Sequence, residues 1–199
     1  MTFRSGFVTI WGQPNVGKST FLNYVLGRKV AIVSSKPQTT RQVLKGILNL
    51  PDAQIVFLDT PGLHSPRDEF SQWMVQEAEK AIIGVDVLLY MIAPHNREEE
   101  DKKYLNNLRS FPNPVLLVLN KKDLVKEEEA QKILARFSPL FDFKGKAAVS
   151  SLTGEGIPEL LSEIVGVLPP GPPYYERDVL SDALERDIVA EIIREKIWW

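Results

Sequence analysis

Short apolar runs alternate along this chain with longer stretches in which apolar residues recur every three or four positions. The short runs are rich in Val, Ile and Leu and have the length of buried strands, whereas the longer stretches have the period of amphipathic helices. Strands that alternate with helices favour a largely parallel sheet with helices on both faces, because each parallel connection needs a crossover. We predict strands at Phe7–Trp11, Val43–Leu50, Gln54–Leu58, Val85–Ala93, Pro114–Leu119 and Lys146–Val149.

The second and third predicted strands are joined differently from the others. Only Pro51, Asp52 and Ala53 separate them. This connection is too short for a parallel crossover, so the two strands should pair as an antiparallel hairpin. The predicted fold class is therefore α/β, with three layers and a mostly parallel six-stranded sheet that carries one antiparallel edge strand.

Helical periodicity and a proline-rich segment predict the domain organisation. Apolar residues at i, i+3 and i+4 spacing predict amphipathic helices in Phe70–Ile82, Ala130–Phe137 and Ile157–Val165. The segment Pro169–Pro173 cannot continue a helix and indicates a stiff linker. We therefore expect a first domain over residues 1–168, a linker over 169–177 and the start of an incomplete second domain over 178–199.

Composition narrows the classes of function. The chain has 24 Lys and Arg residues against 26 Asp and Glu residues, so it lacks the positive field that holds nucleic acid without sequence preference. Cysteine is absent, which excludes disulfides, thiolate metal sites and cysteine nucleophiles. The longest apolar run, Val87–Ala93, is far shorter than the roughly 20 residues that cross a bilayer, and the N-terminus lacks a signal-peptide pattern. We expect a cytoplasmic protein.

A phosphate-binding loop is predicted directly after the first strand, where Gly12–Ser19 fits the pattern GxxxxGK followed by Ser or Thr. Glycines let backbone N–H groups approach phosphate oxygens, and the following helix adds the positive end of its dipole. Lys18 would neutralise the β- and γ-phosphates, and Ser19 would offer its hydroxyl to Mg²⁺. The alternative, a glycine-bounded turn with an exposed lysine, is disfavoured by the flanking strand and helix. The predicted nucleotide contacts are Gln13, Pro14, Asn15, Val16, Gly17, Lys18, Ser19 and Thr20.

An acidic residue and a glycine follow the third strand at the spacing DxxG. Asp59 would hold Mg²⁺ through water, and the N–H of Gly62 would donate to the γ-phosphate. Asp followed by Pro-Gly is also a common turn. The position after the hairpin strand is what favours the binding role.

Guanine selection is predicted from Asn120, Lys121, Lys122 and Asp123, an NKxD motif after the fifth strand. The Asp123 carboxylate would accept hydrogen bonds from the ring N–H and the exocyclic amine of guanine, which adenine cannot supply. Lys121 would lie along the base, Asn120 would tie loops together and Lys122 would be solvated. Alone, this string also fits a plain turn with Asp123 near a helix N-terminus, but the preceding phosphate loop disfavours that interpretation.

Two other loops complete the predicted pocket. Ser150, Ser151 and Leu152 follow the sixth strand, and a backbone contact to guanine is expected at Ser151 with no side-chain role for Leu152.

The polar stretch Lys36–Arg41 is long enough to fold over the nucleotide. Thr40, or its neighbour Thr39, would complete the Mg²⁺ site only when the γ-phosphate is present. A plain surface loop is the alternative.

Hydrolysis would depend on Lys18, Thr40 and Gly62 around an in-line water. The residue after Gly62 is Leu63, which cannot orient water, so we expect slow turnover. Two other functions stay open. A P-loop kinase would leave Asn120–Asp123 unused, and a nucleotide-gated binding module would bind GTP without hydrolysis.

The order of these motifs resembles that of translation-factor-like GTPases over about residues 6–168. Within that class, the strings GQPNVGKST, PQTTR, DTPGLH and ERDIVAEIIREKI are similar to the Era family. The resemblance implies a three-layer P-loop GTPase domain that binds GTP and GDP with Mg²⁺. In related GTPases with an asparagine at the position of Asn15, its side-chain oxygen helps to bind K⁺ between the phosphates, which implies K⁺ as a second cation.

The resemblance also implies partners. Members of the Era family act in small ribosomal subunit assembly and 16S rRNA maturation, bind RNA through a C-terminal KH domain with a GXXG loop, and associate peripherally with the inner membrane face. This chain has no such loop, so RNA contact would lie mainly in the absent KH domain. We expect a monomer.

Overall fold

The computed structural model describes residues 2–30, 44–59 and 84–177. These residues form one sheet in the order β2-β3-β1-β4-β5-β6, in which β2 pairs antiparallel with β3 and the other neighbours pair in parallel. The predicted α/β class and antiparallel edge strand are therefore confirmed. The strands are β1 (Arg4–Trp11), β2 (Leu44–Asn49), β3 (Ala53–Asp59), β4 (Val87–Ile92), β5 (Val115–Leu119) and β6 (Gly145–Ala148).

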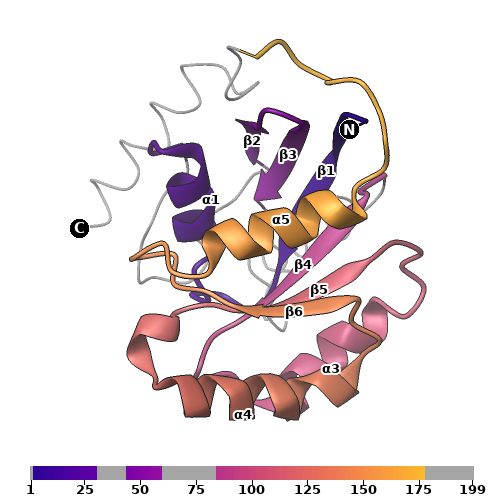
Figure 1. The fold of residues 1–199 in the computed structure, drawn as a ribbon. Coiled ribbons are helices and arrows are strands. Elements are labelled where there is room, and N and C mark those ends of the chain that lie inside the picture. The colour runs from indigo at the N-terminus through magenta and orange to yellow at the C-terminus, as the bar shows by residue number, and fades with distance from the viewer. Residues whose placement is uncertain (1, 31–43, 60–83, 178–199) are drawn as a thin grey trace, which may run out of the picture.

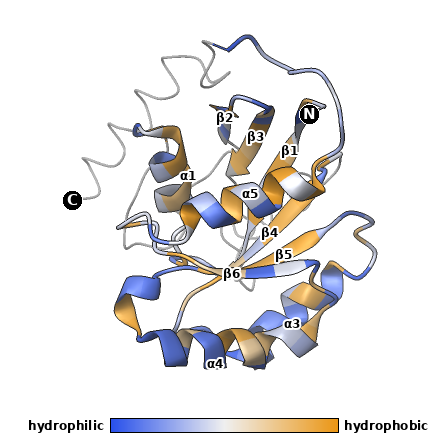
Figure 2. Cartoon of the chain, in the orientation of Figure 1, coloured by the Kyte–Doolittle hydropathy of each residue, from blue (hydrophilic) through white to orange (hydrophobic). Residues whose placement is uncertain are grey.

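Helices cover both faces of this sheet (Figure 1). α1 (Lys18–Leu26) and α5 (Ile157–Val167) lie on one face, and α3 (Glu98–Asn107) and α4 (Glu127–Phe137) lie on the other. Along β4 the odd-numbered side chains pack with α1 and α5, and the even-numbered ones pack with α3 and α4. Figure 2 shows β3, β4 and β5 mostly in the hydrophobic colour, part of β6 in the hydrophilic colour, and hydrophilic residues along α3 and α4. Among the described residues, no helix has the length and hydropathy of a membrane span.

α3 is not among the predicted helices, because its sequence EEEDKKYLNN has no apolar stripe and buries only Asp101 and Leu105. Its acidic residues instead fill the first turn, where the helix dipole favours negative charge. The same effect starts α4 at Glu127, three residues before the predicted Ala130. Short 3₁₀ helices, η1 (Lys122–Leu124) and η2 (Ser138–Leu140), follow β5 and α4. The predicted helix Phe70–Ile82 lies outside the described residues.

The carboxyl ends of the parallel strands form one edge of the sheet. Gly12 follows β1 at this edge, Asn120 follows β5, and Ser150 comes two residues after β6. β1 lies between β3 and β4, so chain connections diverge on its two sides. Open α/β sheets bind ligands in the crevice where connections diverge. The fold therefore brings the predicted motifs to the expected binding edge.

Residues 169–177, the predicted linker, run along the domain in Figure 1 from the end of α5 past the start of β1. The Ser5 N–H donates to the Pro169 carbonyl at 3.3 Å, and the Gly171 N–H donates to the Phe3 carbonyl at 3.1 Å. The proline-rich segment is thus hydrogen-bonded to the first domain over this stretch. The predicted second domain, residues 178–199, lies outside the described residues, and the domain boundaries stay a prediction.

Gln54 fastens the end of this segment to β3. Its side chain is fully buried, and its Oε1 accepts hydrogen bonds from the backbone N–H groups of Tyr174 at 2.7 Å and Tyr175 at 3.0 Å. Its Nε2 donates to the Tyr175 carbonyl at 2.8 Å and to Asn49 Oδ1 at 2.7 Å. One buried amide therefore pairs the segment with the β2–β3 hairpin.

Replacing Gln54 with Leu keeps the side-chain volume but removes all of these partners. Because buried polar groups without partners are costly, we expect the free energy of unfolding to fall by about 1–3 kcal/mol. The amides of Tyr174 and Tyr175 should also exchange faster with deuterium. Gln131→Leu makes the same change on an exposed part of α4 and should leave both amides unaffected. Natural exchange rates in Gln54→Leu would contradict this role.

Candidate nucleotide-binding site

The predicted phosphate loop connects β1 to α1, and two of its glycines sit where no side chain fits. Gly12 has φ +155°, and a Cβ there would lie 2.2 Å from the Met91 carbonyl oxygen on β4. Gly17 has φ +103°, and a Cβ there would lie 2.2 Å from Asn120 Nδ2. These glycines let the loop lie directly against the ends of two neighbouring strands.

Lys18 is the first residue of α1 and is only 7% exposed. Its Nζ donates to the carbonyls of Gly12 and Gln13, each at 3.0 Å, so the ammonium group lies within the loop. Gly17, the N-cap of α1, has no side-chain oxygen for the first-turn N–H groups. These N–H groups, the helix dipole and the ammonium group together suit an anion such as phosphate.

Asn120 joins three loops, as predicted. Its carboxamide is almost fully buried, and Nδ2 donates to the Val16 carbonyl in the phosphate loop at 2.9 Å. Its Oδ1 accepts from the N–H of Ser151 at 3.0 Å and from the hydroxyl of Ser151 at 2.9 Å. The loops after β1, β5 and β6 are therefore held by one side chain.

The predicted guanine-recognising groups lie at the surface of these loops. Asp123 is exposed, and its carboxylate accepts a hydrogen bond from the buried Ser150 hydroxyl. Lys121 has φ +61°, which turns the chain sharply between Asn120 and η1.

The N–H of Ser151 donates to Asn120 Oδ1, and the contact of Ser151 with guanine stays a prediction. Leu152 is 76% exposed. Its side chain adds nothing to the core, and its expected lack of a role at the base stays a prediction.

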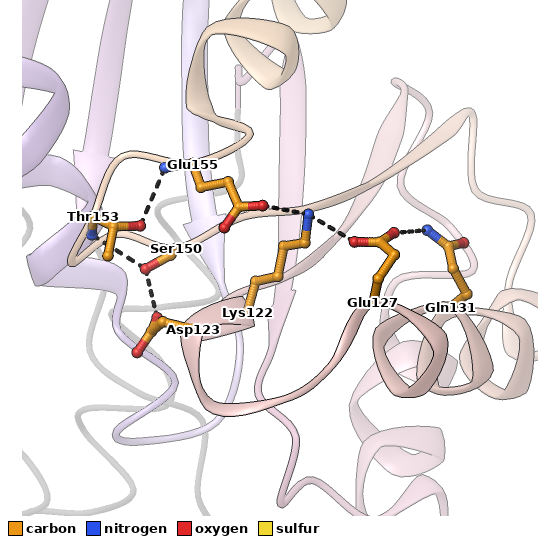
Figure 3. Close-up of polar contacts among 7 residues, drawn as sticks. All are labelled: Lys122, Asp123, Glu127, Gln131, Ser150, Thr153 and Glu155. Carbon is orange, nitrogen blue, oxygen red and sulfur yellow. Dashed lines mark hydrogen bonds and ion pairs between the residues drawn. The ribbon is translucent and has the colours of Figure 1, made fainter.

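Lys122 corrects the sequence analysis, which predicted a solvated side chain. Its Nζ lies 2.7 Å from Glu155 Oε1 and 2.8 Å from Glu127 Oε2 (Figure 3). Hydrogen bonds from Lys122 to Glu127 and then Glu155 raise the pKa of the ammonium group. Two ion pairs thus link this lysine to the start of α4 and to the loop before α5, and spacing along the chain does not reveal the second one.

The predicted Mg²⁺ ligands are only partly described. Ser19 stands in the first turn of α1, and the backbone of Asp59 pairs with Ile10 at the end of β1. Both residues therefore lie at the edge that carries the phosphate loop, which fits the hydroxyl and water-mediated carboxylate ligands that Mg²⁺ uses beside phosphates. Thr40, its alternative Thr39, and Gly62 lie outside the described residues. In the described part of the chain, no three His, Asp or Glu side chains gather as a metal site.

A buried network behind the phosphate loop is missing from the sequence predictions. Asp101 on α3 is fully buried and accepts hydrogen bonds from Tyr90 Oη at 2.6 Å, Asn96 Nδ2 at 2.9 Å and Gln13 Nε2 at 2.9 Å. Burial raises the pKa of the Asp101 carboxyl, while these three hydrogen bonds oppose the shift. The Gln13 bond reaches the loop itself, so α3 helps to hold the phosphate loop in place.

The only sequence signal for this network is the spacing of Asp101 from Leu105 and Leu108, at i, i+4 and i+7. This spacing puts the three residues on one helical face. In a run of four acidic residues, that signal is too weak to single out one of them.

Substitutions of Asp101 test the network. Asp101→Asn keeps an oxygen for Asn96 and Gln13 and turns its amide to the Tyr90 hydroxyl, which can accept. Asp101→Leu removes the carboxylate from three donors, two of them buried. We expect it to lower the free energy of unfolding by about 2–4 kcal/mol, and Asp101→Asn by about 1 kcal/mol or less. Urea unfolding at pH 7 measures both. Equal stabilities for the two variants would exclude this account.

Comparison with known proteins places the chain in a family. The profile of the family described as "50S ribosome-binding GTPase" matches residues 7–121. The chain is 47% identical over 197 residues to GTPase Era of Geotalea uraniireducens and 45% identical over 198 residues to GTPase Era of Caldanaerobacter subterraneus subsp. tengcongensis. These alignments cover 98% and 99% of this chain and 66% of each relative, so the chain spans about two thirds of the length of its curated relatives.

Two solved structures share this fold closely. One is Era in complex with MgGDPNP and nucleotides 1506–1542 of 16S ribosomal RNA, with a TM-score of 0.88 and 37% identity. The other is a variant of Aquifex aeolicus Era bound to GDP and AlF4⁻, with a TM-score of 0.89 and 37% identity. Each match covers 98% of this chain and 67% of the solved chain. The chain therefore belongs to the family of 50S ribosome-binding GTPases and, within it, to the Era-type GTPases.

Proposed function

We propose that this chain binds GTP with Mg²⁺ and hydrolyses it slowly, as the nucleotide switch of an Era-type protein that acts in small ribosomal subunit assembly. The observation that carries the proposal is the Asn120 carboxamide, which joins the phosphate loop at Val16 to the loop of Ser151. A site for a guanine nucleotide needs a base-recognising loop at a fixed distance from a phosphate-binding loop. Asn120 supplies this link.

The phosphate end of the proposed site consists of the loop Gly12–Lys18 and the first turn of α1. Lys18 would turn its ammonium group from the Gly12 and Gln13 carbonyls to the β- and γ-phosphates. Ser19 and Asp59 would hold Mg²⁺, which when bound neutralises charge that develops on the phosphate oxygens. Thr40 and Gly62 are proposed to complete this end around the γ-phosphate. Leu63 in place of a water-orienting side chain supports slow turnover.

The base end of the proposed site is formed by Lys121 and Asp123, with Ser150 holding the Asp123 carboxylate through its hydroxyl. A carboxylate in this position accepts two hydrogen bonds from guanine, whereas adenine presents an acceptor and no matching donor. The mismatch leaves a charged group unpaired, which is costly.

The proposed partners follow from the family. A solved Era relative is bound to a segment of 16S ribosomal RNA, which supports 16S rRNA and the small ribosomal subunit as partners here. RNA contact is proposed to depend mainly on a KH-type domain that begins within residues 178–199. A monomeric state, cytoplasmic location and peripheral contact with the inner membrane face stay predictions of the family resemblance.

Nucleotide affinities measured by calorimetry with Mg²⁺ test the proposal. GTP and GDP should bind at least about a hundredfold more tightly than ATP, since the mismatch places a charged group without a partner. Asp123→Asn should lose this preference and gain affinity for xanthosine triphosphate, whose carbonyl at position 2 can accept from the new amide. Tight binding of ATP, or of no nucleotide, would exclude the proposal. Phosphate release from bound GTP excludes a binding module without hydrolysis, and phosphate transfer to an acceptor would support a kinase.

The cation dependence of GTP hydrolysis is a separate prediction. Asn15 is exposed on the phosphate loop and has φ +63°, and its place on this loop supports the K⁺ role that the family resemblance implies. Single-turnover hydrolysis should be several-fold faster in K⁺ than in Na⁺. Asn15→Gly removes the side chain yet suits the left-handed backbone, and it should abolish this difference while GDP affinity changes little. Equal rates for the natural chain in both salts would exclude K⁺ as a cofactor.

A further inference from the structure

The ion pairs of Lys122 connect the proposed guanine loop to the start of α4, five residues on, and to the loop before α5. Glu127 is the first residue of α4, and Glu155 lies in the loop that precedes α5. The Lys122 side chain is 17% exposed, whereas Glu127 and Glu155 are 60% and 57% exposed. Figure 3 shows the ammonium group between the two carboxylates, with Gln131 donating to the far oxygen of Glu127 at 2.8 Å.

A chain of hydrogen bonds leads from Glu155 back to the proposed base-recognising carboxylate (Figure 3). The Glu155 N–H donates to Thr153 Oγ1 at 3.4 Å, and the Thr153 N–H donates to Ser150 Oγ at 3.2 Å. The Ser150 hydroxyl donates to Asp123. Since Asp123 follows Lys122 directly, these contacts close a ring in which Lys122 and Asp123 hold opposite ends of the loop 150–155.

Besides the hydrogen bonds between Asn120 and Ser151, the backbone joins the two loops next to Lys122. The Lys122 N–H donates to the Val149 carbonyl at 3.0 Å, and within the second loop the Ser150 N–H donates to the Glu155 carbonyl at 2.9 Å. The loop 150–155 is thus folded on itself, so any contact that fixes the Glu155 side chain also restrains the position of Ser150. Lys122 makes this contact through its ion pair with Glu155.

We propose that Lys122 is a positioning residue for guanine recognition. By pairing with Glu155 and Glu127, it holds the loop 150–155 so that Ser150 keeps the Asp123 carboxylate in the orientation that meets the base. Without these ion pairs the two loops sample more arrangements. The apparent affinity for guanine nucleotides then falls in proportion to the fraction of molecules whose loops are arranged to bind. This inference rests on the proposed guanine-nucleotide binding.

The expected effect is modest, because exposed ion pairs contribute little and water screens them. With two such pairs acting on one loop, we expect Lys122→Met to speed GDP dissociation by about two- to tenfold. The stronger signature is specificity. Inosine diphosphate lacks the exocyclic amine that Asp123 would accept from, so misplacement of Asp123 should weaken GDP binding more than inosine diphosphate binding.

The experiment compares the natural chain with Lys122→Met, Lys122→Arg, Glu155→Gln and the double variant Lys122→Met/Glu155→Gln. Stopped-flow release of fluorescent GDP gives dissociation rates, and competition with inosine diphosphate gives the affinity ratio. Lys122→Arg should restore both values, and the double variant should resemble Lys122→Met, because the two side chains act through each other. Arg136→Met is the matched control. It breaks the ion pair of 3.1 Å between Arg136 Nε on α4 and Glu98 Oε1 on α3, and it should alter neither value.

Unchanged dissociation rate and affinity ratio in both Lys122→Met and Glu155→Gln would overturn the inference. An equal loss of GDP and inosine diphosphate affinity would also overturn it, since that pattern indicates a general loss of structure. Failure of the proposed function is distinguishable, because then the natural chain itself would show no preference for guanosine over adenosine nucleotides.

Discussion

The buried carboxamide of Asn120 is the interaction on which the rest of the site depends. Its donor and acceptor ends are paired with loops 104 and 31 residues away along the chain. A buried amide is stable only when both ends are paired, so Asn120 holds these loops next to one another at the points that it contacts. Gly17 shows how closely they meet, since any side chain there would occupy the space of the Asn120 amide. The loops proposed to bind phosphate and base are therefore built as one unit.

The parallel sheet makes this arrangement possible. β1, β5 and β6 run in the same direction, so each delivers its following loop to one edge without a further turn. The side chains of β5 and most of those of β1 are buried between two separate helical layers, whereas β6 is only partly buried. This packing leaves the ends of β1 and β5 little freedom to shift. Precise contacts to a small ligand require loops that are held by a rigid scaffold, and the sheet is that scaffold here.

Much of the fold and of the site was predictable because it depends on local pattern. Apolar runs located every strand, the three-residue gap located the hairpin, and fixed spacing located the phosphate loop and Asn120–Asp123. α3 was not predictable from apolar periodicity, because it has no apolar stripe. Acidic residues in its first turn stabilise it through the helix dipole. Asp101, Gln54 and Lys122 were missed for another reason. Each has at least one partner distant in sequence, Gln13, Tyr175 and Glu155 respectively. The sequence alone does not distinguish such side chains from solvated ones of the same type.

These missed residues also differ in how their contacts act. Asp101 and Gln54 are fully buried, so their polar groups must be paired and removing a partner costs the full penalty of an unpaired buried group. They fix the position of the phosphate loop and of residues 169–177 as parts of the fold. Lys122 pairs with carboxylates that are more than half exposed, and water can replace either partner at small cost. Its contacts can therefore adjust the orientation of a recognition loop without deciding whether the domain folds.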